Sequence, residues 1–222
     1  MQMARSTWGY KKRMTGTALD TSDGTAKESV HAEDVLRAQY YALLSRVLVQ
    51  SPDANTLTML SELGADESDF GVALGAAATV ASKTSPEIAA EEFTKLFYGF
   101  GAGGEIQPYE SLYLTGLMYD KPLAALRGDF AEFGIANSKK NDEPEDHAAY
   151  ILEIMHHLIM DQAGNPVAIE RQQVFFETHI ASWMEKLFED LETTDSSVLY
   201  APIGTIGRLF IRIESEAFEM AA

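Results

Sequence analysis

Five histidines are the side chains best suited to bind a metal or to move a proton, namely His31, His147, His156, His157 and His179. Glu153 precedes His156 by three residues, the E-x-x-H spacing that helical di-iron bundles use. Such a bundle needs a second E-x-x-H, but Phe176 stands three residues before His179. No H-E-x-x-H occurs either. A metal-dependent helical enzyme using His147, Glu153 and His156 is therefore the weaker alternative.

Acidic residues surround a proline and a histidine in the segment 141–147, which reads NDEPEDH. Acids stabilise a helix N-terminus and Pro144 suits the first helical turn, which explains the acids and the proline but not His147. Exposed carboxylates at this point would also bind a basic peptide, because arginine pairs bidentately with a carboxylate. The segment alone leaves both interpretations open.

A glycine-rich segment, residues 99–104, reads GFGAGG and matches G-x-G-x-x-G. The dinucleotide fingerprint needs a preceding strand and a following helix, whereas residues 91–98 have a helical pattern and Glu105 to Pro108 follow. We expect a flexible connection between helices. Aromatic residues flank it: Phe93 and Phe97 have core spacing, while Tyr109 and Tyr113 could line a groove for an apolar peptide.

Composition narrows the classes of function. The 222 residues include 17 basic and 34 acidic side chains, a formal charge of −17, which repels nucleic acid and anionic lipid but attracts a basic peptide. No cysteine is present, so disulfides, thiolate metal sites and a cysteine nucleophile are excluded. No G-x-S-x-G occurs to suggest a hydrolase.

Helical periodicity dominates the rest of the chain, and no segment alternates apolar and polar residues for long enough to predict a sheet. The fold class expected is all-α, a helical bundle of about eight to nine helices. Ser85-Pro86-Glu87 is a typical helix start. The expected helices are 31–50, 57–63, 66–81, one from Ser85, 112–119, one from 120 to near 134, 145–161, 167–191 and 198–218.

The first residues read MQMARSTWGYKKRM and carry charge, but no apolar stretch follows them. We therefore expect no secretory signal, and a loose N-terminal arm over residues 1–28. No apolar run approaches the roughly 20 residues of a membrane span. These features together predict a soluble, cytoplasmic protein.

Four regions share order and spacing with one known family. They are 40–48 (YYALLSRVL) with Pro52, 96–99 and 108–113 (LFYG and PYESLY), 143–147 leading into 153–155 (EPEDH and EIM), and 175–183 (FFETHIASW). Across residues 35 to about 190 the chain resembles the TorD/DmsD/NarJ family of redox-enzyme maturation chaperones, with E-P-x-D-H the most diagnostic motif. The arm and the glycine-rich loop depart from the family pattern.

The resemblance implies two helical lobes joined by a hinge: an N-terminal lobe at 29–135, a linker at 136–147 and a C-terminal lobe at 148–222, acting as one chaperone domain. It implies a non-enzymatic chaperone that binds the twin-arginine signal peptide, and the apo form, of a molybdenum-cofactor oxidoreductase and assists cofactor loading before export. The implied client is a molybdoenzyme such as a DMSO or TMAO reductase or a formate dehydrogenase, and the sequence does not name it. The alternative within the family is an assembly scaffold for a reductase subunit that is not exported.

The resemblance also implies a peptide site without catalytic or metal-binding residues. We expect Glu143 and Asp146 to face arginine, and Leu96, Phe97 and Tyr109 to pack with Tyr113 on the apolar part of the signal. No resident cofactor is implied, although weak guanine-nucleotide binding is associated with the family. Neither nucleic acid binding nor stable membrane insertion is expected, and the chain would be a monomer or a domain-swapped dimer. The implied site residues are Leu96, Phe97, Gly99, Tyr109, Glu110, Ser111, Tyr113, Glu143, Pro144, Asp146 and His147.

Overall fold

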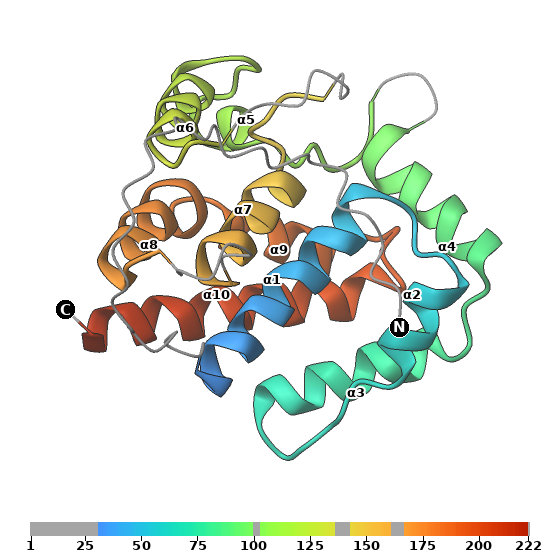
Figure 1. The fold of residues 1–222 in the computed structure, drawn as a ribbon. Coiled ribbons are helices and arrows are strands. Elements are labelled where there is room, and N and C mark those ends of the chain that lie inside the picture. The colour runs from blue at the N-terminus through green and yellow to red at the C-terminus, as the bar shows by residue number, and fades with distance from the viewer. Residues whose placement is uncertain (1–30, 100–102, 136–142, 161–166, 222) are drawn as a thin grey trace, which may run out of the picture.

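A computed structural model describes residues 31–99, 103–135, 143–160 and 167–221. This part of the chain is all-helical, as predicted (Figure 1). It contains α1 (Ala32–Val49), α2 (Ala54–Ser61), α3 (Asp69–Ala81), α4 (Pro86–Phe93), η1 (Thr94–Tyr98), α5 (Glu110–Thr115), α6 (Lys121–Glu132), α7 (Ala148–Met160), α8 (Ile169–Phe176), η2 (Glu177–Ala181), α9 (Met184–Thr193) and α10 (Tyr200–Ala221). The segments η1 and η2 are single π-helical turns.

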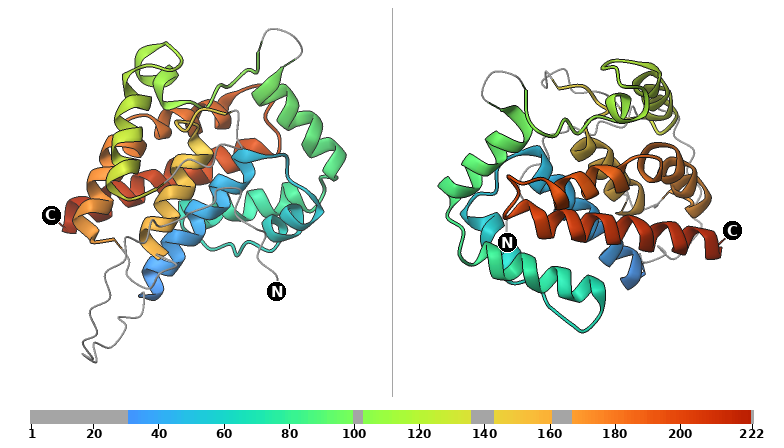
Figure 2. Two further views of the ribbon diagram at one scale, coloured as in Figure 1. Left: turned by 45° about the horizontal axis from the view of Figure 1, so that its top comes forward. Right: turned by 180° about the vertical axis from the view of Figure 1, so that it is seen from behind.

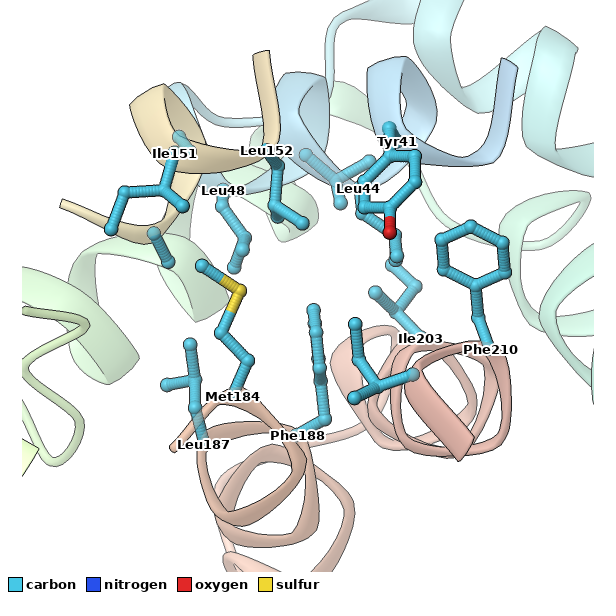
Figure 3. Packing of buried hydrophobic residues seen from close by; sticks show 14 of the residues in the cluster. Tyr41, Leu44, Leu48, Ile151, Leu152, Met184, Leu187, Phe188, Ile203 and Phe210 are labelled. Atoms are coloured by element: carbon cyan, nitrogen blue, oxygen red, sulfur yellow. The ribbon is translucent and has the colours of Figure 1, made fainter. Parts of the chain in front are cut away.

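The core joins the two halves of the chain. Helix α1 packs along α7, and α10 packs on α9 and α3. Figure 3 shows side chains of α1, α7, α9 and α10 converging on one apolar interior, with Tyr41, Leu152 and Phe188 among them. These buried residues belong to a single cluster, so the lobes predicted at 29–135 and 148–222 share their core in the described residues.

Local signals in the sequence explain several helix starts. Asp53 accepts a hydrogen bond from the backbone N–H of Thr56 at 2.8 Å, and Ser68 accepts one from Gly71 at 3.0 Å. Ser85 caps α4 with Pro86 in its first turn, which confirms the predicted start. Such caps satisfy N–H groups that have no partner inside the helix.

Helix α10 is capped from a distant part of the chain. The carboxylate of Glu92, on α4, accepts hydrogen bonds from the backbone N–H groups of Val198, Leu199 and Tyr200 at 2.8–3.0 Å. Further along, α10 lies against α9 so closely that a Cβ on Gly207 would meet the ring of Phe188 (Figure 2, right, α10 in red). The position of α10 is therefore fixed by α4 and α9 together.

The single helix predicted for 167–191 is wrong, because it divides into α8, η2 and α9. The break falls at Trp183, whose indole Nε1 donates a 2.7 Å hydrogen bond to the carbonyl of His179. That carbonyl is the acceptor a continuous helix would offer to the N–H of Trp183, which donates instead to Ile180. The side chain thus competes with the backbone and interrupts the helix.

Other boundaries differ less. The helix predicted at 112–119 begins earlier, at Glu110, and ends at Thr115 before Gly116, which has a φ of 75°. The predicted arm at 1–28, residues 136–142 of the linker and the turn at 164–166 lie outside the described residues. No helix in the described residues is long and apolar enough to cross a lipid bilayer.

Candidate functional site

Two of the motifs found in the sequence meet through their backbones. Tyr109 and His147 form an antiparallel bridge. The N–H of Glu110 donates to the carbonyl of Asp146 at 2.9 Å, and the N–H of Ala148 donates to the carbonyl of Pro108 at 2.8 Å. The bridge therefore fixes the start of α5 beside the start of α7, as the upper part of Figure 1 shows.

A pocket lies beside this bridge, between the end of α1, the turn η1 and the start of α7. Its volume is about 30 Å³, so it admits the end of one side chain rather than a peptide segment. Tyr109 donates a 2.5 Å hydrogen bond to Oε2 of Glu143, an exposed carboxylate at the rim. The lining residues are Leu48, Val49, Phe93, Phe97, Tyr98, Pro108, Tyr109, Glu143, His147 and Tyr150.

Aromatic rings and one carboxylate set the chemistry of this pocket. Burial, the hydrogen bond to Glu143 and the charges of Glu143 and nearby tyrosines raise the pKa of Tyr109 well above its ordinary range. The phenol therefore stays protonated and holds Glu143 in place as a hydrogen-bond donor. A carboxylate has room for further donors, and aromatic faces attract cations. The rim can thus receive a guanidinium or ammonium group.

His147 contributes a neutral ring to the pocket. Its Nδ1 accepts a hydrogen bond from the N–H of Ala149 at 3.1 Å, so it caps α7. Burial lowers the pKa of His147 to about 4. Its ring lies 5.2 Å from that of Tyr109 and 5.6 Å from that of Tyr150. His147 is therefore an aromatic wall and a helix cap, without a charge at neutral pH.

The rest of the E-P-x-D-H motif faces the interior. Asp146 is fully buried, and its Oδ2 accepts a hydrogen bond from the N–H of Ser111 at 3.1 Å, which caps α5. The structure thus contradicts the expectation that Asp146 faces a peptide arginine. Pro144 is buried, and Glu145 binds Arg127 of α6 at 2.7 Å. Glu143 alone among the three acids of this motif is exposed.

Glu110 belongs to a separate buried charge cluster. His179, on η2, is fully buried, with Nδ1 2.9 Å from Glu110 Oε1 and Nε2 2.6 Å from Asp129 Oδ2. Burial lowers the pKa of His179, but the bonds and charges of the two carboxylates outweigh it, so the net pKa is raised. Burial raises the pKa of Glu110 in turn. The imidazolium joins α5, α6 and η2.

Leu96 and Gly99 lie next to the lining residues Phe97 and Tyr98 but do not line the pocket themselves. Leu96 is fully buried, and its carbonyl accepts a hydrogen bond from the N–H of Ile106 at 2.8 Å. A Cβ on Gly104 would lie 2.3 Å from the carbonyl carbon of Phe97. Contrary to the expected flexible connection, the described end of the glycine-rich segment packs tightly on η1. Gly99, with a φ of 66°, ends that turn.

Tyr113 lies outside the pocket. Its hydroxyl donates a 2.9 Å hydrogen bond to Asp190 on α9, and its ring is 5.3 Å from Trp183. It therefore packs against α9 rather than completing the apolar groove expected beside Tyr109.

The three residues of the alternative metal site, His147, Glu153 and His156, do not form one cluster that could bind a metal. Glu153 lies 3.8 Å from His157, and Nδ1 of His156 is 2.8 Å from the carbonyl of Ala38. Nδ1 of His147 is occupied as a helix cap. No group of three or more histidine, aspartate or glutamate side chains in the described residues could hold a metal ion.

Comparison with known protein families shows to which family the chain belongs. Residues 63–189 match the family model described as nitrate reductase delta subunit. The chain belongs to this family. The family includes the TorD and NarJ proteins, so the predicted resemblance is confirmed. It is a family of maturation chaperones rather than enzymes.

Several curated proteins of the family are similar to this chain. Chaperone protein TorD of Photobacterium profundum is 30% identical over 119 residues, which are 50% of this chain and 55% of that protein. Chaperone protein TorD of Vibrio parahaemolyticus is 27% identical over 134 residues, 57% of this chain and 62% of that protein. The chain thus spans between half and two thirds of the length of these relatives. An Archaeoglobus fulgidus crystal structure assigned to redox enzyme maturation has a TM-score of 0.47 at 19% identity, covering 86% of this chain and 99% of that one.

The predicted site residues fall into two sets, those that line the pocket and those that do not. Phe97, Tyr109, Glu143 and His147 line the pocket, whereas Tyr113 and the remaining predicted residues lie outside it and support the fold. Six lining residues were not predicted: Leu48, Val49, Phe93, Tyr98, Pro108 and Tyr150. Tyr150 follows His147 by three residues on a helix, a spacing that could have revealed it. The contribution of α1 depends on packing that no local pattern encodes.

Proposed function

We propose that this chain is a cytoplasmic chaperone for a molybdenum-cofactor oxidoreductase, and that it binds the twin-arginine signal peptide of that client. Membership of the maturation chaperone family supports the general role. The specific support is the pocket: an exposed carboxylate, Glu143, held by Tyr109 at the rim of an aromatic hollow.

The chemistry of a twin-arginine signal suits this arrangement. Its guanidinium group can pair with Glu143 and lie against the neighbouring tyrosine rings. The volume of the pocket suits the end of one such side chain. The apolar part of the signal would then need an exposed apolar surface, and Tyr98 in the pocket wall and Leu114 and Leu117, shortly after Tyr109 in the sequence, are exposed hydrophobic side chains.

Calorimetric titration of the full chain with a synthetic leader tests this proposal. The controls are the same leader with both arginines replaced by glutamine, and two variants of equal charge, Glu143→Gln and Glu216→Gln. Glu216 is exposed on α10, away from the pocket. We expect Glu143→Gln to weaken binding about tenfold, the worth of one charge-assisted hydrogen bond, and Glu216→Gln to have little effect.

Each other outcome has a distinct meaning. Equal weakening by both variants would contradict a specific role of Glu143 and indicate general charge attraction. Binding of both leaders with equal affinity would remove the arginines from recognition. Binding of neither leader would contradict the signal-peptide proposal and favour an assembly scaffold that grips the client itself.

A further inference from the structure

The charge of this chain is divided unevenly along its length. The first 30 residues carry five basic and three acidic side chains, so the remaining 192 carry 12 basic and 31 acidic ones. Within the first 14 residues there are four basic side chains and no acidic one: Arg5, Lys11, Lys12 and Arg13. The run of three consecutive basic residues at 11–13 is thus tethered to a strongly acidic helical body.

Aromatic residues lie directly beside these cations. Trp8 and Tyr10 precede Lys11, so two aromatic side chains lie within three residues of the basic run 11–13. The pocket offers the complementary groups, with Glu143 at its rim and Phe97, Tyr98 and Tyr109 in its wall. A second hollow with three carboxylates is lined by Glu105, Ile106, Asp190, Thr193, Thr194 and Asp195. Carboxylate next to aromatic surface recognises cationic side chains.

We propose that residues 5–14 of this chain bind its own pocket at Glu143 and act as an internal competitor of external basic peptides. The competition rests on the proposed function, whereas the binding of the segment to the pocket does not. An external basic peptide then has to displace the segment in order to bind.

The tether has a suitable length. Leu48 and Val49 line the pocket at the end of α1, and the helix starts at Ala32, so the span is about 24 Å at 1.5 Å per residue. A flexible chain of 17 residues, the number between Arg13 and His31, has an r.m.s. end-to-end distance of roughly 21–25 Å. A linker whose r.m.s. length matches its span gives an effective concentration of about 1 mM, close to the maximum.

Competition of this strength has a measurable effect. With an effective concentration of about 1 mM and a weak intrinsic affinity of about 0.1 mM, the tethered segment lowers the apparent affinity of an external peptide about tenfold. The full chain with Lys11→Gln, Lys12→Gln and Arg13→Gln should therefore bind the synthetic leader about tenfold more tightly than the unchanged chain. The substitutions lie before the described helices, so the helical body stays intact.

Paramagnetic relaxation gives a direct test that needs no client. The chain contains no cysteine, so Ser6→Cys carries the one nitroxide label in the full chain. We expect strong broadening of the methyl signals of Leu48 and Val49 in the pocket wall, and none for Val174, which is exposed on α8. The three glutamine substitutions should abolish the broadening, and Glu143→Gln should reduce it.

The outcomes separate the two proposals. Unbroadened pocket methyls overturn the internal competitor, even if the leader binds. Broadened pocket methyls with no leader binding support it and contradict the proposed function instead. Diluting the labelled chain into unlabelled, isotope-enriched chain detects binding between molecules, and broadening in that mixture overturns an intramolecular contact.

Discussion

His147 and His179 lie in two regions of the molecule that treat an imidazole in opposite ways. At the start of α7, burial without a charged partner keeps His147 neutral and lowers its pKa to about 4. On η2, His179 is fully buried but has a carboxylate on each ring nitrogen, and its pKa is raised. Burial disfavours the charged form, and two hydrogen-bonded carboxylates reverse that preference.

The difference teaches that acids adjacent in sequence need not pair with a histidine. Three of the four residues before His147 are acids, yet these bind Tyr109, Arg127 and the N–H of Ser111. His179 obtains Glu110 and Asp129 from positions 69 and 50 residues away. The charge of each histidine is thus set by the fold.

Removal of the His179 ring should have the largest effect on stability. We expect His179→Ala to lower the free energy of unfolding by about 3–5 kcal/mol, because it leaves the buried Glu110 without its partner. The matched control is His157→Ala, which removes a partly buried ring 3.8 Å from Glu153 and should cost at most about 1 kcal/mol. Urea denaturation measures both, and equal losses would contradict a paired imidazolium.

The same cluster gives a pH signature. A raised histidine pKa means that the folded state holds a proton that the unfolded state releases, so stability falls as pH rises from about 6.5 through the folded pKa. The free energy of unfolding, followed from pH 6 to 9, should fall in the unchanged chain and not in His179→Gln. A decline of the same size in both chains would remove His179 as its source.

His147 should produce the opposite dependence in acid. Its folded pKa of about 4 lies below the unfolded value, so stability contributed by the neutral ring is present above about pH 6.5 and lost towards pH 4, by up to about 3 kcal/mol. His147→Asn keeps an acceptor for the cap of α7 but cannot titrate. The difference between the two chains, measured at several pH values, should shrink or change sign across this window. A constant difference would show that His147 does not titrate there.

Substitutions of Asp146 and Glu143, two of the three acids of the E-P-x-D-H motif, should differ in their effect on stability by a smaller margin. Asp146→Ala leaves the buried N–H of Ser111 without its acceptor and should cost about 1–3 kcal/mol, while Asp146→Asn retains an acceptor and costs less. Glu143→Ala, at the exposed rim, should change stability by no more than about 0.5 kcal/mol. Thermal unfolding of the three variants is the measurement. A larger loss of stability in Glu143→Ala than in Asp146→Ala would contradict the assignment of Asp146 as the buried acid and Glu143 as the exposed one.

Much of the fold could be predicted because its signals are local. Helix starts at Ser85-Pro86 and near Asp120, and the apolar stripes of α1 and α7, depend on residues a few positions apart. The break at Trp183 could not be predicted, since an indole that bonds the carbonyl four residues back leaves no sequence pattern. Tertiary hydrogen bonds of this kind override helical periodicity.

The candidate site was predictable in part for a similar reason. The motif residues Tyr109, Glu143 and His147 were recognisable by type and spacing and do line one pocket. Asp146 was expected to face the peptide, and this was wrong. Its side chain is buried by the bridge between Tyr109 and His147, which joins segments nearly 40 positions apart. Sequence spacing indicates which residues belong together, and the backbone pairing decides which of them face solvent.

The carboxylate of Glu92 ties the start of α10 to a residue more than 100 positions earlier. The first turn of the longest helix in the described residues is therefore complete only when α4 is in place. Amide hydrogen exchange in that first turn should then accelerate when α4 alone is loosened, for instance by Ser85→Ala. Two helices more than 100 positions apart in the sequence would then open as one cooperative unit.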